Sequence, residues 1–374
     1  MIKILIVFGT RPEFIKLLPI IIYLKKIKKL NLFVCNTGQH KELLKPFLDF
    51  YNIKIDFNLK TLKNKQNLSE LSSVLFKKID KLYFDLKPKY VVVQGDTSSS
   101  FISSIVAFYN QIKVFHIEAG LRTNNIYFPW PEEVNRQFIS KISYHHFAPS
   151  INAKKNLIYE GVASKNITLV GNTVIDTLFI TLEILKKNKS LLKQIKIKTN
   201  FLNKNKFNIL ITAHRRENFG KNISEILKAI DRISKYNNVN IIYSHHKNEI
   251  LSKKQRHILN SNKNIFSISN VDYNEFVYIM KNIDLIMSDS GGIQEEAPSL
   301  GKPLIILRYK TERIEAVKKG SAILVKPKCD NIVEKFDKIY SNKRVLNKMS
   351  IKRNLYGKGN SAQKICKKII NLIF

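Results

Sequence analysis

The sequence predicts an α/β protein with two doubly wound, Rossmann-like domains, each built on a parallel sheet. Short β-branched runs alternate with helical segments of about 10–15 residues along the chain. This series restarts after about residue 172, and 374 residues exceed what one hydrophobic core usually holds. We therefore expect a first domain over residues 1–172, a second over 173–355, and a ligand cleft between them.

The expected elements follow in order. In the first domain, apolar runs at 3–8, 31–37, 90–95 and 113–119 predict strands, and the segments 13–27, 41–51, 99–110 and 134–147 predict helices. The last of these helices would carry His145 and His146. In the second domain, strands are expected at 207–213, 239–246, 265–269, 283–289, 303–308 and 321–325, with helices between them.

Composition excludes several classes of protein. The longest apolar stretches fall short of the roughly 20 residues that span a bilayer, and the N-terminal run indicates a first strand rather than a signal peptide. The three cysteines, Cys35, Cys329 and Cys366, are scattered without metal-like spacing. We expect a cytoplasmic protein that spans no membrane.

The formal net charge of +35 is of a size typical of nucleic-acid-binding proteins. However, 53 of the 64 basic residues are Lys, spread over the whole length of a chain that is also rich in Asn and Ile. This pattern favours a general drift in composition over a dedicated basic patch, and we expect no nucleic-acid partner.

Against this background the arginines are informative, because a guanidinium offers a planar, bidentate fork that Lys lacks. Seven of the 11 lie in or beside polar segments that follow strands. They indicate recognition of phosphate or carboxylate, and ordinary structural ion pairs remain the alternative. The seven are Arg11, Arg122, Arg136, Arg215, Arg216, Arg308 and Arg313.

Polar segments follow almost every expected strand. Because ligands of parallel sheets bind at the carboxyl ends of the strands, these segments are the candidate site. They are GTRPEFIK (9–16), TGQH (37–40), QGDTSSS (94–100), HIEAGLRT (116–123), PWPEEVNRQ (129–137), AHRRENFG (213–220), SHHKN (244–248) and DSGGIQEE (289–296).

The segment DSGGIQEE predicts an anion site at the start of a helix. Ser290 is placed to cap the helix, and Gly291 and Gly292 let a phosphate approach the backbone amides. Glu296, one turn further, is placed to accept hydrogen bonds from a ribose. A plain capped turn is the alternative.

Two further segments predict anion contacts. Arg11 and Lys16 offer cations after the first strand, and His214, Arg215 and Arg216 suit a diphosphate. Neither the dinucleotide-binding nor the P-loop glycine pattern occurs, and no group of His, Cys and acidic residues has metal spacing, so we expect no cofactor and no metal.

The first domain also places acidic residues after its strands or in a proline-rich loop. Asp96, Glu118, Glu132 and Glu133 form this set. Carboxylates gathered near a cleft can divide acid and base roles between them, whereas helix caps or partners of Arg are the alternative.

Taken in this order, GTRPExxK, GDT, EAGLRT, PWPEExNR, GNTVIDTL, HRREN and DSGGIQEEAPSLGKP resemble the non-hydrolysing UDP-N-acetylglucosamine 2-epimerases. The resemblance implies a GT-B architecture in which the final helix, within 356–374, returns to the first domain. It also implies a homodimer that interconverts UDP-GlcNAc and UDP-ManNAc through elimination of UDP, to supply a surface polysaccharide.

The resemblance implies roles for single residues. Asp96, Glu118 and Glu132 would transfer protons. The resemblance does not assign which of them is the acid and which is the base. His214 would belong to the catalytic set and also hold the diphosphate. The substrate would further be held by Arg11, Lys16, Arg215, Ser290, Gly291, Gly292, Glu296 and Arg313.

The sequence departs from the family pattern at Ala213, where Gly is usual, and at Ile314, where Pro is usual. Some members bind a second, regulatory UDP-GlcNAc beside residues that match Gln39, His40 and His246, and its retention here stays open. A same-family epimerase acting on a modified sugar nucleotide, such as a diacetamido uronic acid, is the alternative substrate assignment. A GT-B glycosyltransferase is the alternative activity.

Overall fold

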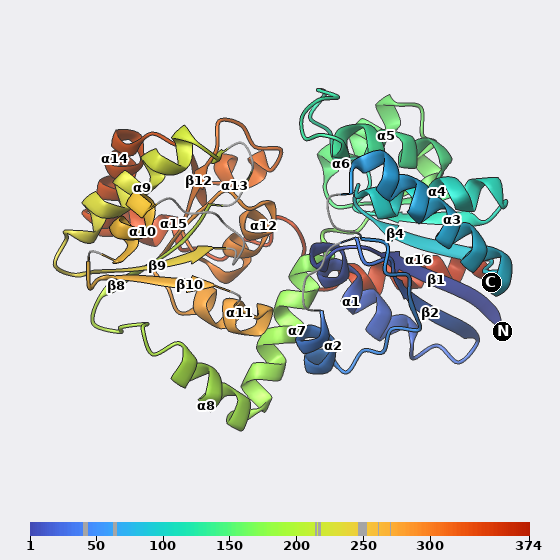
Figure 1. Ribbon diagram of the computed structural model, residues 1–374, viewed down its shortest axis with the longest axis horizontal. Helices are drawn as coiled ribbons and strands as arrows, with labels where there is room; N and C mark the ends of the chain where they lie inside the picture. The colour runs from blue at the N-terminus through green and yellow to red at the C-terminus, as the bar shows by residue number, and fades with distance from the viewer. Residues whose placement is uncertain are drawn as a thin grey trace. The chain divides into compact units, whose positions relative to one another are not determined.

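The computed structural model describes residues 1–39, 44–62, 66–213, 215, 218–245, 253–260, 262–269 and 271–374, with the backbone alone at 253–255. These residues form two compact units. Unit 1 comprises Met1–Thr177 and Tyr356–Phe374, and unit 2 comprises Leu178–Leu355 (Figure 1). The chain passes from unit 1 to unit 2 within α7 (Thr173–Lys187).

Unit 1 contains a seven-stranded sheet in the order β3-β2-β1-β4-β5-β6-β7, with every neighbouring pair parallel. The order in which successive strands are added reverses between β1 and β4, the position at which doubly wound sheets bind ligands. The strands are β1 (Ile2–Phe8), β2 (Leu30–Asn36), β3 (Phe57–Asn58), β4 (Tyr90–Gln94), β5 (Lys113–Ile117), β6 (His145–Ala148) and β7 (Ile167–Leu169).

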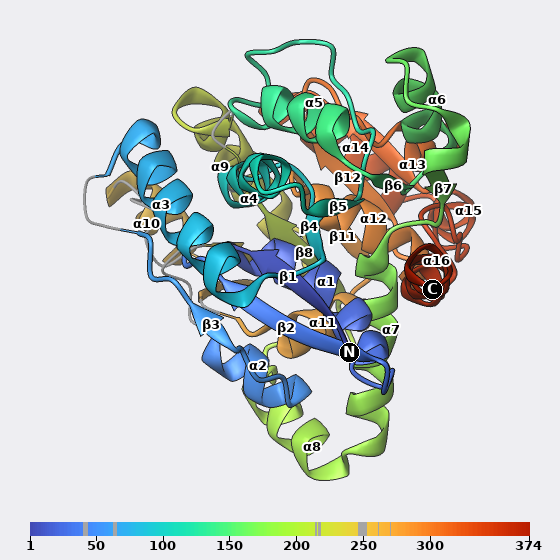
Figure 2. The ribbon, with the colours of Figure 1, turned by 90° about the vertical axis from the view of Figure 1, so that its right-hand side faces the viewer.

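Helices cover both faces of this sheet (Figure 2). Three of them, α3, α4 and α5, pack side by side over one face, and α1 packs beside the C-terminal helix α16 over the other. The helices are α1 (Arg11–Leu24), α2 (Lys45–Tyr51), α3 (Leu68–Leu86), α4 (Ser98–Tyr109), α5 (Glu132–Ile142), α6 (Ile151–Tyr159), the short 3₁₀ turn η1 (Ser164–Asn166) and α16 (Ser361–Ile373).

Unit 2 repeats the plan with a six-stranded parallel sheet in the order β10-β9-β8-β11-β12-β13. The order in which successive strands are added reverses between β8 and β11. The strands are β8 (Phe207–Thr212), β9 (Val239–His245), β10 (Ile265–Ser269), β11 (Leu285–Ser288), β12 (Leu304–Leu307) and β13 (Ala322–Val325). The parallel sheets of the two units confirm the predicted α/β class.

The helices of unit 2 pack in two groups. On one side, α9 contacts α10 and α14, and α14 contacts α15, whereas α12 contacts α11 and α13. Their bounds are α8 (Lys189–Lys198), α9 (Lys221–Ser234), α10 (Lys253–Asn260), α11 (Tyr273–Lys281), α12 (Gly291–Leu300), α13 (Ile314–Lys318), α14 (Cys329–Tyr340) and α15 (Lys343–Met349).

The predicted helix over 134–147 is wrong at its end. Helix α5 ends at Ile142, and His145 and His146 lie in β6, where both are buried. Strand pairing with β5 and β7 decides this segment, and those partners are distant in the sequence.

None of the helices in the part of the chain that the structure describes combines the length and the apolar character needed to cross a bilayer.

Candidate active site

A buried carboxylate, Glu13, fixes the turn after β1. It accepts hydrogen bonds from the amides of Gly9 (3.0 Å) and Thr10 (2.8 Å) and from the hydroxyls of Thr97 (2.7 Å) and Ser100 (2.8 Å). Burial raises the pKa of Glu13, and these donors oppose that shift. The carboxylate therefore ties the start of α1 to the start of α4, and with them the predicted residues that these turns carry.

Glu118 follows β5 directly and has a left-handed backbone, with φ +63°. Its Oε2 atom is ion-paired with Lys16 Nζ and accepts a hydrogen bond from Gln94 Nε2 at 2.6 Å. The Lys16 and Glu118 side chains are only 14% and 6% exposed, so this pair is largely shielded from water. The structure therefore brings two predicted residues together and adds Gln94, the first residue of the segment QGDTSSS, to which the sequence analysis assigned no role.

Asp96 lies in the turn between β4 and α4, and its side chain is ion-paired with Arg136 of α5. The distance between Asp96 Oδ2 and Arg136 Nη2 is 2.7 Å, and Asn135 Nδ2 donates to the backbone oxygen of Asp96 at 2.9 Å. Glu133 is fully buried, lies 3.4 Å from Arg136 Nη1 and accepts the Thr123 amide at 3.1 Å. Glu133 therefore supports the loop before α5.

Three other predicted residues of unit 1 lie at or beside the start of a helix. Arg11 is the first residue of α1, with its guanidinium carbon 6.0 Å from the centroid of the Phe47 ring. Glu132 is the first residue of α5 and is half-buried. Gln39 Oε1 accepts hydrogen bonds from the amide (3.0 Å) and hydroxyl (2.7 Å) of Ser99, beside the start of α4.

Unit 2 gathers guanidinium groups against Gly291, the first residue of α12. A Cβ atom at Gly291 would lie 2.9 Å from Arg313 Cζ and 3.1 Å from Arg215 Nη2. The pKa of Arg215 is lowered mainly by burial and secondly by the positive charge of Arg308. The start of a helix favours an anion, and the guanidinium groups of Arg215 and Arg313 add positive charge at this point.

Two carboxylates hold these arginines in place. Arg313 Nε donates to Glu295 Oε1 at 2.6 Å, and Arg313 is also ion-paired with Glu312. The other oxygen of Glu312 lies 3.0 Å from Arg308 Nη1. Burial alone would raise the pKa of Glu312, but Arg313 and Arg308 together hold it well below its ordinary value.

The next turn of α12 presents a different chemistry. Glu296 is 4% exposed and its Oε1 accepts a hydrogen bond from the phenol of Tyr273 at 2.5 Å. A Cβ atom at Gly292 would lie 3.8 Å from Glu296 Oε2. Ser290 is the N-cap residue of α12, as predicted, but its side chain makes no capping hydrogen bond in the described part of the chain.

His40, His214, Arg216 and His246, which the sequence analysis selected, lie outside the described residues. Among the residues that are described, no group of three or more His, Cys, Asp or Glu side chains is arranged to hold a metal ion.

Comparison with known proteins matches this chain along its length. Residues 23–370 match the family described as "UDP-N-acetylglucosamine 2-epimerase". The relative of that name from Neisseria meningitidis serogroup A is 42% identical over 369 residues, covering 98% of this chain and 99% of its own. The chain belongs to the UDP-N-acetylglucosamine 2-epimerase family.

Two further matches support membership of the epimerase family. The Campylobacter jejuni protein of that name is 41% identical over 377 residues, covering 99% of this chain and 97% of its own. The crystal structure of the Neisseria meningitidis epimerase bound to UDP-GlcNAc has a TM-score of 0.95 and 42% identity, covering 99% of this chain and 100% of its own. These matches confirm the predicted family and the predicted architecture of two Rossmann-like domains.

Sequence reasoning missed several residues that shape this epimerase-family site. Glu13 belongs to a capping box with Thr10, and the T-x-x-E pattern at 10–13 was a signal for it. Gln94 is the last residue of β4 and the first of the selected segment QGDTSSS, but its side chain was given no role. Glu312 precedes the selected Arg313 and carried no separate signal.

Proposed function

We propose that this chain interconverts UDP-GlcNAc and UDP-ManNAc by eliminating UDP to form 2-acetamidoglucal and adding UDP back. The observation that carries the proposal is the match, over nearly the whole chain, to proteins named UDP-N-acetylglucosamine 2-epimerase, one of them crystallised with UDP-GlcNAc. The site residues of each unit fit one part of this reaction.

Unit 2 holds the UDP. The anionic diphosphate pairs with Arg215 and Arg313 and approaches the backbone amides at Ser290, Gly291 and Gly292. The guanidinium groups around Gly291 and the start of α12 support this assignment. Arg11 of unit 1 and His214 complete the set that the family resemblance implies.

Glu296 accepts hydrogen bonds from the ribose. The two glycines support this assignment, because Gly291 faces the guanidinium groups and the next residue, Gly292, faces the Glu296 carboxylate. The groups that bind the phosphate and the carboxylate that accepts from the ribose are therefore adjacent, as a phosphate and a ribose are in a nucleotide.

Unit 1 transfers the protons. A carboxylate takes the C2 proton, the C–H electron pair forms the C1–C2 double bond, and the C1–O bond breaks with its electron pair leaving on UDP. UDP then adds back after a proton reaches the other face of C2. Asp96, Glu118 and Glu132 divide these steps.

The contacts of Glu118 suit a proton acceptor. Its Oε2 receives both an ammonium and an amide hydrogen bond, from Lys16 and Gln94, and these two donors fix the orientation of the carboxylate. Asp96 faces the Arg136 guanidinium in a similar way. We assign both to proton transfer, with Lys16 placing the Glu118 carboxylate.

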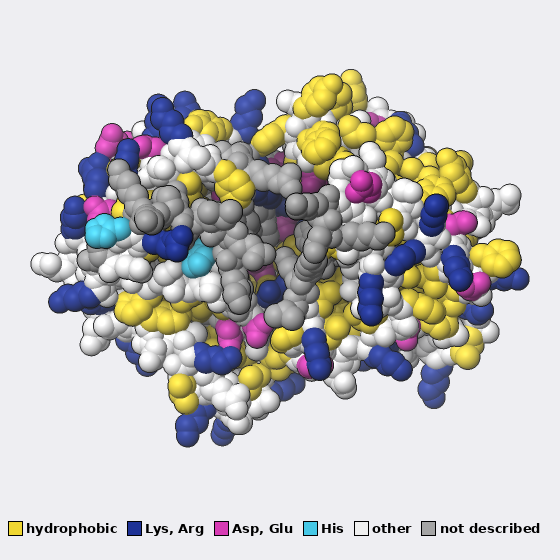
Figure 3. Space-filling model, viewed as in Figure 1, with side chains coloured by type: hydrophobic (Ala, Val, Ile, Leu, Met, Phe, Trp, Pro, Cys, Tyr) yellow, Lys and Arg dark blue, Asp and Glu magenta, His cyan; other side chains and the backbone are white. Residues whose placement is uncertain are grey.

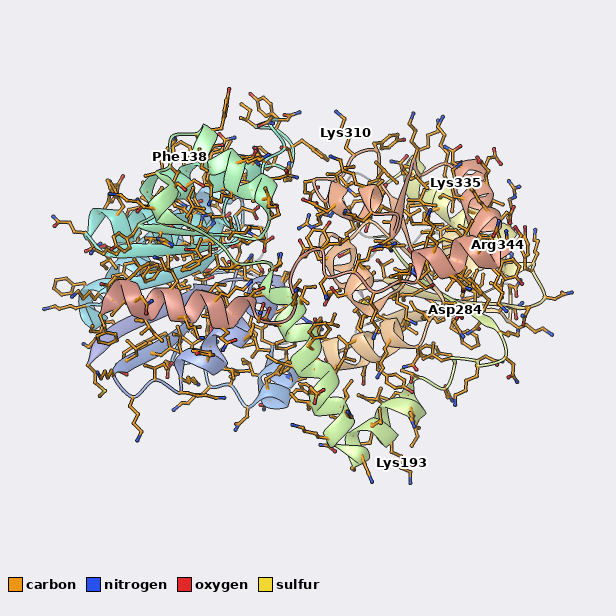
Figure 4. All side chains as sticks on the ribbon, turned by 180° about the vertical axis from the view of Figure 1, so that it is seen from behind. Phe138, Lys193, Asp284, Lys310, Lys335 and Arg344 are labelled. Carbon is orange, nitrogen blue, oxygen red and sulfur yellow. The ribbon has the colours of Figure 1, made fainter. Side chains whose placement is uncertain are left out.

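We also propose a homodimer formed through α4 and α5. Phe108 and Tyr109 at the end of α4 and Phe138 of α5 are all more than half exposed, although the chain carries a net charge of +35, and Phe138 is labelled in Figure 4. Hydrophobic side chains gather over α5 and the loop before it, whereas Lys and Arg are scattered (Figure 3). Two copies of so basic a chain approach most easily where charge is absent.

Sedimentation velocity tests this surface. We expect the wild-type chain to sediment as a dimer and Phe108→Lys to sediment as a monomer, because the new ammonium would be buried against its own copy. A wild-type monomer would refute the dimer, and a dimer that tolerates Phe108→Lys would place the interface elsewhere.

We place the enzyme in the cytoplasm, where it supplies a sugar nucleotide for a surface polysaccharide. The three cysteines are free and buried, as expected in a reducing compartment.

The activity is tested by incubating the purified chain with UDP-GlcNAc and separating the nucleotide sugars by ion-exchange chromatography. We expect UDP-ManNAc to appear without added metal or nicotinamide. Release of free UDP and ManNAc would indicate a hydrolase instead. Unchanged UDP-GlcNAc would refute this substrate, and a diacetamido uronic acid nucleotide would then be tested.

A further inference from the structure

The pair formed by Tyr273 and Glu296 is a buried hydrogen bond to a carboxylate. The Tyr273 phenol donates to Glu296 Oε1 at 2.5 Å, and the two residues are 6% and 4% exposed. A hydrogen bond from a hydroxyl to an ionised carboxylate is among the strong ones, and its energy is greatest where water is excluded. This bond therefore restricts the rotation of the Glu296 carboxyl group.

Tyr273 is itself held firmly. It is the first residue of α11, which begins with a capping box formed by Asp272 and Glu275. Glu275 Oε1 is also 2.5 Å from Lys198 Nζ of α8. Because the start of the helix is fixed in this way, the phenol reaches Glu296 from a defined position.

The second oxygen of Glu296 lies on the side of the glycine turn. A Cβ atom at Gly292 would lie 3.8 Å from Oε2, an ordinary van der Waals distance. With Oε1 engaged by Tyr273, Oε2 is the atom oriented towards the turn that we assign to the nucleotide.

We propose that Tyr273 is a positioning residue that orients Glu296 and thereby makes the site selective for ribonucleotides over nucleotides that lack the ribose hydroxyls. This inference rests on the proposed function, which assigns UDP to unit 2. A site built to hydrogen-bond a ligand hydroxyl rejects the analogue without it, because the buried acceptor is then left unpaired. Rejection of this kind requires an acceptor held in one orientation, and Tyr273 provides that constraint.

Calorimetric titration with UDP and with 2′,3′-dideoxy-UDP tests the inference on the full chain. We expect the wild-type chain to bind UDP at least about tenfold more tightly than the dideoxy analogue, since one hydrogen bond to a charged group is lost. Tyr273→Phe should weaken UDP about tenfold and leave the dideoxy analogue within about twofold, so the selectivity collapses. Circular dichroism confirms that the variant is folded.

Tyr278→Phe is the matched control. It makes the same change on the same helix, α11, without removing the contact to Glu296, and it should keep the wild-type ratio of affinities. Equal weakening of both nucleotides by Tyr273→Phe would overturn the inference, because it would indicate a purely structural role. A variant that binds both nucleotides as the wild-type chain does would overturn it too, because its ratio of UDP affinity to dideoxy-UDP affinity would be unchanged. A wild-type chain that binds UDP no better than the analogue would overturn it as well. If the wild-type chain binds neither nucleotide, the proposed function itself fails.

Discussion

Replacing Gly291 by Ala tests whether the arginines of unit 2 are rigidly held. The new Cβ would lie 2.9 Å from both Cζ and Nη1 of Arg313 and 3.1 Å from Nη2 of Arg215. Ordinary contacts between such atoms begin near about 3.5 Å, so the Arg313 guanidinium must retreat. It is held by Glu295, 2.6 Å from its Nε, and by Glu312, so the retreat stretches buried ion pairs.

The cost follows from those contacts. Weakening one buried hydrogen bond to a charged group costs about 1.5–3 kcal/mol. The lower entropy of the unfolded chain with Ala offsets about 0.4–1 kcal/mol of it. We expect Gly291→Ala to lower the free energy of unfolding of unit 2 by about 1–2 kcal/mol. We also expect UDP affinity to fall at least about tenfold, because the methyl group displaces the cation that the diphosphate requires.

Gly292→Ala is the matched control. Its Cβ would meet Glu296 Oε2 at 3.8 Å and no nearer described atom, so the free protein accommodates it. Its free energy of unfolding should be unchanged or higher by about 0.4–1 kcal/mol. Urea unfolding and UDP calorimetry measure both variants. Equal stabilities for the two would refute the rigid arginine cluster.

Three further predictions concern unit 1. Asp96→Asn should abolish turnover while UDP binding survives, and unchanged turnover would remove Asp96 from the catalytic set. Gln94→Met, which keeps the length of the side chain but removes the donor to Glu118, should lower kcat about tenfold and leave UDP affinity unchanged. This effect should vanish in a Glu118→Gln background, and its persistence there would indicate a fault elsewhere in the fold. Burial lowers the pKa of His116 to about 4 and that of His146 to about 3, from an ordinary value of 6.5. Between pH 6.5 and about 4 the unfolded chain therefore binds more protons at these histidines than the folded chain does. Stability should therefore fall as the pH falls through that window, by about 1.4 kcal/mol per pH unit for each, and His146→Phe should reduce the slope of urea midpoints against pH. An unchanged slope would contradict the buried, neutral state of His146.

The long elements were predictable because each carries its own local signal. Strands such as β4, which is buried along its whole length, appear in the sequence as continuous apolar runs between helical patterns. The segment at His145 and His146 lacks such a signal: it continues a helical run, and only pairing with β5 and β7 makes it a strand. Its conformation is therefore a tertiary outcome that a local pattern does not contain.

The candidate site divides in the same way. The rule that ligands bind after parallel strands located Asp96, Glu118 and Arg215, since each follows a strand. The partners of these residues come from other elements. Arg136 meets Asp96 from a helix 40 positions further along, and Lys16 of α1 meets Glu118, which lies 102 positions later in the chain. Pairing of this kind depends on the folded chain.

A proton NMR time course with UDP-GlcNAc in deuterated water tests the central claim most directly. We predict that UDP-ManNAc appears with deuterium at C2 and that deuterium also enters the recovered UDP-GlcNAc, since both arise by reprotonation of one intermediate. UDP-ManNAc that retains the original hydrogen at C2 would contradict transfer of the C2 proton to carboxylates that exchange protons with the solvent. The absence of any UDP-ManNAc would contradict the proposed activity.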